Sequence, residues 1–410
     1  MASTRNEPNK TAIYATALTA FFAIAGIAIV DPILPVIGAD LGASTWQIEL
    51  LFTAYIALMA LGMIPAVMAT GKFGYKKILI TGVSTVGVAA ILAGFSQNIA
   101  QLAVLRAFWG LGNAMFFATA MVLLVSLASD RAWVVELFET CVGLGFAVGP
   151  LLGGLLGEIK WRIPFLACGL FMIIALVVSA SRLKDPAEKP APLRLGSIFK
   201  LYGKPAFLVL CVITAAYNYV FFVVLGYTPV FLNLGVIALG FVFTGWGVGL
   251  AFGILVVGHK LAHKIGAVQT IFVAILGVLV SVIIFALHPS TAWMVVVLVF
   301  AGICMGIMNA NLTDMSLALG SPDRRVTTGA FNLVRWGFAA PAPVIAGIIS
   351  KTHVAAPFWV GAAVLAVGII VFLAAGHVMA RGMGERFLWA KWNAAARVEE
   401  GTPEEILGEV

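Results

Sequence analysis

Six ionisable side chains interrupt long apolar stretches of this sequence. Inside a hydrocarbon layer a charge is costly, so such residues are functional candidates by default. Burial favours the neutral form of a carboxyl group, whereas a nearby guanidinium favours the charged form. A carboxyl held between these two influences could release a proton when a ligand binds and take up another afterwards. The candidates for such chemistry are Asp31, Arg106, Glu136, Glu139, Asp314 and Arg335.

Asp31 and Arg106 form the strongest pair among them. Asp31 precedes the end of its apolar stretch by six residues, and Arg106 follows the start of its own by five. At about 1.5 Å per helical residue, both lie roughly 8–9 Å from the same boundary, which makes contact possible. We predict that they couple proton movement; the alternative is a static ion pair that fixes helix packing. Pro32 and Pro35 follow Asp31 and predict a kink in its helix.

Four further acids lie on the predicted helices, two of them near helix ends. Glu136 and Glu139 are three residues apart, which places them on nearly the same helix face. The deeper Glu139 is expected to carry a proton or attract a cationic substrate. Glu136 is expected to contact substrate or, alternatively, to face the cytoplasmic vestibule. Asp314, near the end of its stretch, indicates a gate, and Glu49 is expected to face water.

Arg335 lies well inside its apolar stretch, about 15 Å deep. It suits an anionic or zwitterionic substrate, or a carboxylate partner across a cavity. Several uncharged polar residues are further candidates for lining such a cavity, although polar residues also hold membrane helices together. They are Asn113, Tyr217, Asn218, Asn309, Asn311 and Asn332.

The elements that carry these residues are long and apolar. The chain has 410 residues, of which 62% are hydrophobic and only 10% are charged. Apolar stretches of about 20 residues recur along it, each long enough to cross a bilayer as a helix. Their continuity argues against a membrane β-barrel, whose strands alternate polar and apolar residues. The predicted spans are 12–37, 46–70, 77–95, 101–128, 132–157, 163–182, 206–231, 237–257, 267–287, 291–319, 326–350 and 355–378.

Basic residues predict the orientation of these spans. Of the 25 Lys and Arg residues, Arg106 and Arg335 lie within spans and only Lys160, Arg162 and Lys351 lie on the side away from the termini. Basic loops stay in the cytoplasm, so both termini are predicted to be cytoplasmic. The net charge of +7 therefore indicates membrane orientation and not nucleic acid binding. The four cysteines are scattered and predict no disulfide frame or metal site.

The sequence repeats itself at a separation of about 193 residues, as in Asp130-Arg131 with Asp323-Arg324 and in Pro150 with Pro343. Two six-helix halves joined by a basic linker are typical of transporters whose halves rock about a central substrate. We predict an all-α membrane protein with twelve transmembrane helices in two pseudo-symmetric six-helix bundles around a central cavity. The expected parts are an N-terminal bundle at 1–182, a cytoplasmic linker at 183–204, a C-terminal bundle at 205–378 and a cytoplasmic tail at 379–410 with an interfacial amphipathic helix.

Two motifs resemble the major facilitator superfamily, specifically its twelve-helix drug:proton antiporter branch. "LRAFWGLGNA" at 105–114 is similar to the family's fourth-helix motif, and "GLGFAVGPLLGGLLG" at 143–157 is similar to its fifth-helix antiporter motif. The resemblance covers nearly the whole chain and is closest to bacterial multidrug and siderophore exporters. It implies that the fifth helix packs against the other half near the hinge of the rocking motion. The corresponding hinge residues are Gly145, Gly149, Pro150, Gly153 and Gly154.

The loop "TGKFGYKK" at 70–77 departs from the family pattern. Gly71 stands where the family has an acid that holds the cytoplasmic side shut, although basic residues including Lys72 remain. This replacement puts the family's latch in question. Gating roles are still predicted for Lys72, Gly74 and Asp314.

Together these features predict proton-coupled efflux of amphipathic small organic molecules, such as drugs or siderophore-like compounds, by alternating access. One alternative is a facilitator or symporter for a specific anionic metabolite, and another is a non-transporting lipid-handling or receptor-like protein. The sequence contains no phosphate-loop motif. The expected energy source is therefore the proton gradient, with no enzyme activity, metal or other cofactor. The expected partners are a small-molecule substrate, protons and membrane lipid, without nucleic acid, for a monomer in the bacterial plasma membrane.

Overall fold

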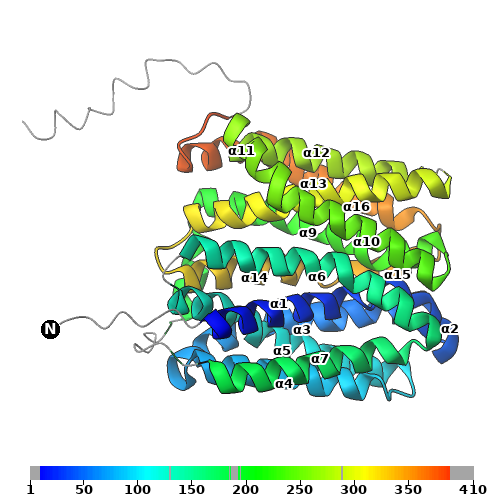
Figure 1. The fold of residues 1–410 in the computed structure, drawn as a ribbon. Coiled ribbons are helices and arrows are strands. Elements are labelled where there is room, and N and C mark those ends of the chain that lie inside the picture. Colours follow the sequence, from blue (N-terminus) through cyan, green and yellow to red (C-terminus); the bar gives the residue numbers. More distant parts are fainter. Residues whose placement is uncertain are drawn as a thin grey trace, which may run out of the picture.

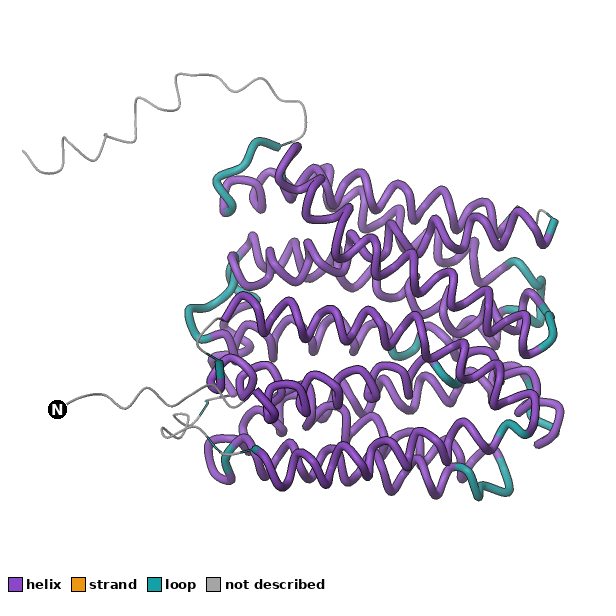
Figure 2. The backbone as a smooth tube through the Cα atoms, viewed as in Figure 1, coloured by secondary structure: helices purple, strands orange, loops and turns teal. Residues whose placement is uncertain are grey.

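The computed structural model describes residues 10–128, 131–183, 185, 193, 195–287 and 290–387. Within these ranges every regular element is helical and no strand occurs (Figure 2). Twelve helical spans are long and apolar enough to cross a membrane. The predicted all-α architecture is therefore confirmed. Its physical reason is that a helix bonds its backbone groups within the segment, as a hydrocarbon surrounding requires.

The first six spans include one that is built from three consecutive elements. That span combines α1, the 3₁₀ helix η1 and α2, and each of the next five is a single helix. The elements are α1 (Lys10–Ala28), η1 (Asp31–Ile33), α2 (Leu34–Leu41), α3 (Thr45–Phe73), α4 (Tyr75–Ala93), α5 (Ile99–Leu127), α6 (Arg131–Ile159) and α7 (Arg162–Arg182).

The second six spans follow a short helix, α8 (Leu195–Leu201). The eighth span contains a π-helical turn, and the eleventh is divided in two near Pro341. The elements are α9 (Pro205–Leu232), α10 (Val236–Phe252), the π-helix η2 (Gly253–Gly258), α11 (His259–Ile265), α12 (Ala267–Ala286), α13 (Thr291–Leu319), α14 (Arg324–Ala339), α15 (Ala342–Ile349) and α16 (Ala356–Gly382).

The helices lie side by side along a common direction, with their connections at the two ends of the bundle (Figure 1). We name the end where α1 begins and α16 ends the terminal end. The opposite end, where α2 is followed by α3, is the distal end. The elements α1 to α7 occupy the lower part of Figure 1, and most second-half helices lie above them. Residues 388–410, with most of the predicted interfacial helix, lie outside the described part of the chain.

The first span is broken at the residues that the sequence singled out. After α1 the chain forms a turn and then η1, which begins with Asp31 and Pro32. A proline lacks the backbone donor and interrupts the helical bonding before it, which explains the predicted kink. The span continues to Leu41 instead of ending at Ile37, and Gly42 then supplies a left-handed residue with a φ of 59°. Asp31 therefore lies about 15 Å from the distal end, deeper than predicted.

Both halves make the turn between their second and third spans with a glycine of positive φ and an acidic helix cap. Gly74 and Gly266 have φ values of 85° and 92°, which residues with a Cβ rarely adopt. In each half, an acid that follows the last helix caps the start of the third span, which begins after this glycine. Asp185 accepts a hydrogen bond from the backbone N–H of Lys76 at 2.7 Å, and Glu385 accepts two from the first turn of α12 at 2.9 and 3.0 Å. The carboxylates lie at the positive ends of the helix dipoles.

The halves meet along two sets of helices. The helix α6 packs against α10, and α3 packs against α14 and α15. At the first contact the backbones approach closely, since a Cβ on Gly154 would lie 2.9 Å from the Cα of Gly240. A Cβ on Gly240 would in turn lie 3.0 Å from the carbonyl oxygen of Pro150. Small residues allow membrane helices to pack at this distance.

The glycines of α6 divide between two faces of the helix. Gly145 and Gly149 pack against the backbone of α1, and Gly153, four residues further on, packs against Ile29 just after α1, all in their own half. Gly154 faces α10 instead, because one residue turns an α-helix by about 100°. The first three glycines thus contact their own half, and their predicted hinge roles stay predictions. Of the predicted hinge residues, Gly154 and Pro150 lie at the contact between the halves.

Candidate functional site

Asp31 and Arg106 both lie inside the first half. Asp31 is on η1 and Arg106 is on α5, and both residues are fully buried. Their charges act on each other, but no ion pair joins them. Among the described residues, neither side chain has a hydrogen-bond partner. Arg106 is seven residues from the start of α5, or about 10 Å, so it lies nearer the distal end than Asp31 does.

Aromatic rings surround the guanidinium of Arg106. Its central carbon lies 4.7 Å from the ring centroid of Tyr55 and 4.9 Å from that of Trp109. The face of an aromatic ring attracts a cation, so the two rings hold the guanidinium without neutralising it. Asn113 donates a hydrogen bond from Nδ2 to the Tyr55 hydroxyl at 2.6 Å and joins α5 to α3. The predicted substrate role of Asn113 stays a prediction.

Glu49 does not face water, and that expectation is wrong. It lies four residues after the start of α3, yet it is fully buried. The second half covers it: a Cβ on Gly226 of α9 would lie 2.6 Å from Glu49 Oε2, and one on Gly347 of α15 would lie 3.1 Å from its Cγ. Neither carboxyl oxygen has a hydrogen-bond partner within the described part of the chain. The first half thus contains a second buried carboxyl, whose charge acts on Asp31.

Arg335 is the corresponding central charge of the second half. It is partly buried on α14 and donates a hydrogen bond from Nη2 to Asn309 Oδ1 of α13 at 2.9 Å. Its guanidinium carbon also lies 5.0 Å from the ring centroid of Trp336. Asn332, one turn earlier on α14, is partly buried as well. Arg335 and Asn309, both predicted substrate contacts, therefore form one polar unit between two helices.

The other predicted polar residues of the second half are buried and bonded. Tyr217 donates to the carbonyl oxygen of Met305 at 2.8 Å and joins α9 to α13. Asn218 donates to the carbonyl oxygen of Thr214, one turn earlier, at 3.0 Å. These bonds satisfy polar groups that water does not reach. The structure gives each residue a packing role, and their substrate roles stay predictions.

The remaining predicted site residues lie nearer the terminal end. Glu136 and Glu139 belong to α6, but their side chains are outside the described part of the structure. Asp314 is exposed on α13, and the charge of His259 acts on it. Lys72 is exposed in the last turn of α3, with its Nζ 5.2 Å from the ring centroid of Phe73. Gating roles for Asp314 and Lys72 stay predictions.

A contact between the halves lies at the terminal end, close to the loop that lacks its acid. The hydroxyl of Tyr75, at the start of α4, lies against Arg325 of α14. Arg325 also donates to Asp323 from Nε at 3.0 Å and from Nη2 at 2.8 Å. These bonds from Arg325 lower the pKa of the Asp323 carboxyl below its ordinary value. The sequence predicted no role for Tyr75, and only the repeated Asp-Arg pair pointed to this region.

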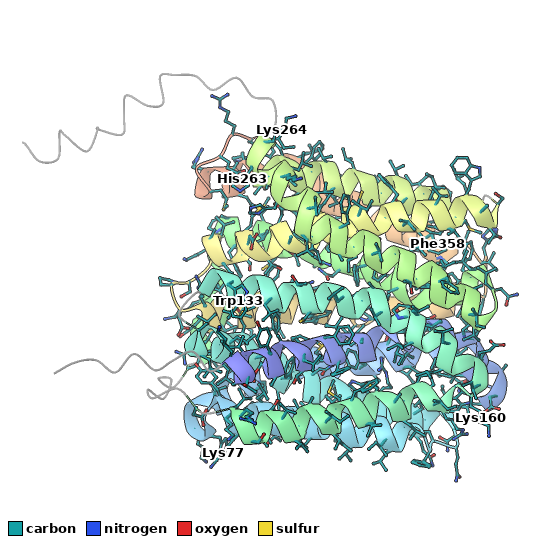
Figure 3. The ribbon with its side chains drawn as sticks, viewed as in Figure 1. Lys77, Trp133, Lys160, His263, Lys264 and Phe358 are labelled. Atoms are coloured by element: carbon teal, nitrogen blue, oxygen red, sulfur yellow. The ribbon has the colours of Figure 1, made fainter. Side chains whose placement is uncertain are left out.

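Basic side chains are unequally distributed between the two ends. Lys77, His263 and Lys264 lie at the terminal end, whereas Lys160 lies at the distal end (Figure 3). Such an asymmetry predicts that the terminal end faces the cytoplasm.

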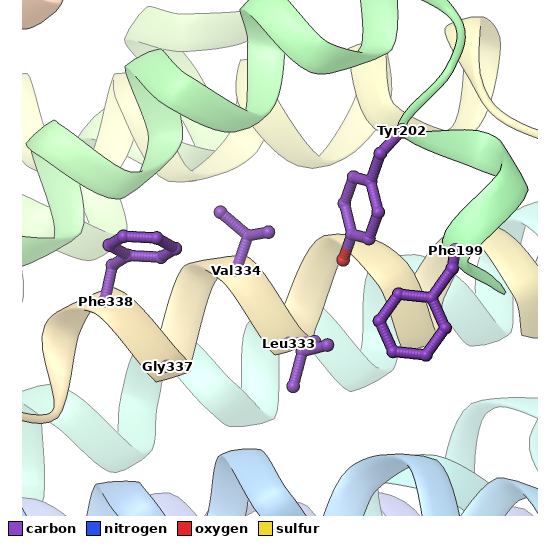
Figure 4. A pocket seen from close by; sticks show the side chains of 6 residues that line it. All are labelled: Phe199, Tyr202, Leu333, Val334, Gly337 and Phe338. Atoms are coloured by element: carbon purple, nitrogen blue, oxygen red, sulfur yellow. The ribbon is translucent and has the colours of Figure 1, made fainter.

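Two open apolar grooves lie on the second half. The first, of about 440 Å³, lies between α8 and α14 (Figure 4). The second, of about 230 Å³, lies between α9 and α16 beside Phe338. Neither groove is lined by a predicted site residue, so the candidate site is the set of buried polar groups. The residues of the first groove are Phe199, Tyr202, Leu333, Val334, Gly337 and Phe338.

Known proteins resemble this chain over most of its length. A family model described as Major Facilitator Superfamily matches residues 16–343. The chain belongs to the Major Facilitator Superfamily. One relative in the superfamily, the multidrug efflux protein YfmO of Bacillus subtilis (strain 168), is 35% identical over 370 residues, which cover 88% of this chain and 92% of YfmO. Another, the quinolone resistance protein NorA of Staphylococcus aureus (strain MRSA252), is 24% identical over 86% of this chain and 93% of NorA.

The Major Facilitator Superfamily fold is also found by comparison with solved structures. A bacterial homologue of the human lysosomal transporter Spinster, in an inward-facing and occupied conformation, has a TM-score of 0.72 at 17% sequence identity. The match covers 95% of this chain and 100% of that chain. The family and the relatives together identify a multi-pass membrane transporter, and transporters of this family are not enzymes.

Proposed function

We propose that this superfamily member exports amphipathic small organic molecules in exchange for protons. The observation that carries the proposal is the pair of fully buried charges, Asp31 and Arg106, on packed spans of one half. Among the described residues neither side chain has an ion-pair or hydrogen-bond partner, so a static packing role would leave much of the cost of burying them uncompensated. The relatives named as a multidrug efflux protein and a quinolone resistance protein support export of varied organic molecules.

Asp31 is the proton carrier in the proposed cycle. When the terminal end opens, water and substrate reach the interior, and the Asp31 carboxyl gives up its proton as substrate binds. The positive charge of Arg106, held between two rings, then stabilises the carboxylate through space. When the distal end opens, substrate leaves and the carboxyl takes up a proton. Proton and substrate therefore occupy the protein in alternation and move in opposite directions.

Aromatic side chains support a lipophilic substrate. The ring centroids of Phe222 on α9 and Trp336 on α14 are 5.8 Å apart. Across the contact between the halves, the ring centroids of Phe146 and Trp246 are 6.0 Å apart. Such rings can stack on a flat apolar molecule. In this proposal Glu139, together with Arg335 and the amide side chains, would contact the polar part of the substrate.

Arg335 favours a second candidate function, which is facilitated transport or symport of an anionic metabolite. A guanidinium matches the geometry of a carboxylate or a phosphate better than any other side chain does. Arg335 is held in place by Asn309, so its position between α13 and α14 is defined. An anion bound there would be transported without help from Asp31.

The proposed location is the plasma membrane of a bacterium, with the terminal end and both chain termini in the cytoplasm. The distal end would then face outward. The proposed transporter works as a monomer, uses the proton gradient and needs no cofactor. Lipid surrounds the bundle, and nucleic acid has no part in the cycle.

Transport by the purified protein in liposomes tests the proposal. A fluorescent lipophilic cation reports substrate movement, and a trapped pH-sensitive dye reports proton movement. The expected result is counterflow of protons with substrate, which stops when a protonophore collapses the gradient. Substrate movement without proton flux would indicate a facilitator, and movement of both in one direction would indicate a symporter. Either outcome would overturn the exchange mechanism.

A further inference from the structure

Glu49 is a buried carboxyl that the proposed transport cycle does not use. It lies on α3, four residues from the distal end of that helix, and it is fully buried. The elements α9 and α15 cover it, and both belong to the other half. Its burial therefore depends on contact between the halves.

The surroundings of Glu49 fit the carboxyl group closely but offer it no hydrogen bond. A Cβ on Gly226 would lie 2.6 Å from Oε2, so a larger residue there would displace the carboxyl from its present position. A Cβ on Gly347 would lie 2.6 Å from the Cα of Trp46, so the backbones of α15 and α3 also meet here. No described residue bonds to either oxygen of Glu49. The carboxyl is thus sealed where the two halves close the distal end.

The charged groups around Glu49 do not neutralise it. Asp31 on η1 is another carboxyl, and Tyr227 on α9 carries no positive charge; these are the titratable groups on which the charge of Glu49 acts. The helix α15 has no titratable side chain. Arg106 on α5 acts on Asp31 and stacks on rings. Closing the halves over an ionised Glu49 would bury an anion without a partner, which is strongly unfavourable.

We propose that Glu49 is a proton-binding latch: the distal end closes when Glu49 binds a proton, and the proton returns to the same side when that end reopens. A neutral carboxyl can enter the apolar contact with Gly226 and Gly347, whereas a hydrated carboxylate holds the halves apart. In the proposed orientation the distal end faces outward, so external acid favours closure after substrate has left. Glu49 is sealed from the terminal end whenever the distal end is shut, so its proton is never transported.

The latch rests on the alternating access of the proposed function, but it does not require Asp31 to carry the transported proton. It can therefore be tested without substrate or gradient. Spin labels at Ala39 and Thr352, which are exposed near the distal ends of the two halves, report the separation of those ends. The labelled protein, with its four native cysteines replaced, is measured in lipid nanodiscs over a series of pH values.

In the otherwise unchanged protein, the population with a long distance between the labels should grow as pH rises. Glu49→Gln should keep the short distance at every pH, because an amide cannot ionise. Glu49→Met, a second neutral side chain of similar length, should do the same and serves if the amide variant does not fold. Asp31→Asn should retain the pH transition, which separates the latch from the transported proton.

Two further variants calibrate this measurement. Glu158→Gln removes an exposed carboxyl at the distal end of α6 and should leave the pH profile unchanged. Gly347→Ala places a methyl group against the backbone of α3 and should produce the long distance at every pH, which establishes the signal of an open distal end.

Three results would overturn the latch. The first is an unchanged pH transition in Glu49→Gln and Glu49→Met. The second is loss of the transition in Asp31→Asn, which would make Asp31 the sensor. The third is a lower number of protons exchanged per substrate by Glu49→Gln in liposomes, which would make Glu49 a carrier. If proton exchange is absent from the native protein while the transition still depends on Glu49, the proposed function fails and the latch stands.

Discussion

The two halves of this transporter repeat the same order of helices but hold their buried charges in different ways. In the first half, Asp31, Glu49 and Arg106 are fully buried without hydrogen-bond partners in the described residues. In the second half, the partly buried Arg335 bonds to Asn309. A bonded charge is stable in its present arrangement. A buried charge without such bonds is stabilised by any change that brings water, a proton or a ligand to it, so we infer that the first half responds to protons.

The largest expected effect comes from removing the carboxyl at the centre of the first half. Asp31→Asn should reduce proton-coupled efflux to the level of empty liposomes, because an amide cannot exchange a proton, while neutral substrate still binds. The matched change in the second half, Arg335→Gln, should preserve proton coupling. It should weaken substrate binding roughly tenfold to a hundredfold, since a hydrogen bond to a charged group contributes about 1.5–3 kcal/mol. Substrate and proton fluxes and a binding titration measure both variants.

Retained pH-dependent efflux in Asp31→Asn would refute its coupling role. Equal loss of proton coupling in both variants would contradict the inference that the first half alone responds to protons.

A smaller effect is expected from enlarging glycines on the two faces of α6. Gly149→Leu would press against the backbone of α1, since a Cβ there already lies 2.7 Å from the carbonyl oxygen of Ala25. This overpacking within one half should cost about 1–3 kcal/mol of stability. Gly154→Leu would instead press against Gly240 of the other half, so it should impair transport more than stability. Thermal unfolding and liposome transport distinguish them, and identical behaviour would contradict the division into two faces.

The helix caps offer a finer comparison between the halves. Glu385 accepts two backbone hydrogen bonds at the start of α12, whereas Asp185 accepts one at the start of α4. Removing a helix cap costs about 1 kcal/mol. Glu385→Ala should therefore lower the melting temperature more than Asp185→Ala does. Thermal unfolding of the purified proteins measures both variants. The reverse order would contradict the idea that the cap accepting two hydrogen bonds stabilises the protein more than the cap accepting one.

The smallest expected effect concerns Asp323 and its pH dependence. The hydrogen bonds from Arg325 lower the pKa of this carboxyl below 3.8, its ordinary value. A group whose pKa is depressed by folding stabilises the protein above its unfolded pKa and loses this contribution as pH falls through the folded pKa. The extra stability of the native protein relative to Asp323→Asn should therefore be complete at neutral pH and should shrink below about pH 4. Because Asp323 is more than a third exposed, the advantage should be only about 0.5 kcal/mol.

Thermal unfolding of both proteins over that pH range measures the difference. A difference between them that grows toward acid pH would contradict the assigned sign. Tyr75→Phe, which removes the hydroxyl beside Arg325 from the first half, should leave this pH dependence in place.

The sequence predicted part of the site because some residues stand out without knowledge of their neighbours. Asp31 could be found because it is an acid inside an apolar stretch, and the kink could be found because Pro32 follows it. Glu49 could not be recognised, because an acid four residues from a helix end resembles a surface acid until α9 and α15 are placed over it. The division of the α6 glycines was missed for a similar reason, since a spacing of four predicts a face but not the helix it meets.

By itself, the sequence determined that the chain forms twelve apolar helices in two repeated sets, because the length of each apolar stretch and the positions of its charges are local properties. Only the tertiary structure decided which charges have partners. Arg335 meets Asn309, Arg106 meets two rings instead of Asp31, and Glu49 is sealed by the opposite half. The physical reason is that the free energy of a buried charge depends on groups within a few ångströms, and helices distant in sequence bring those groups together.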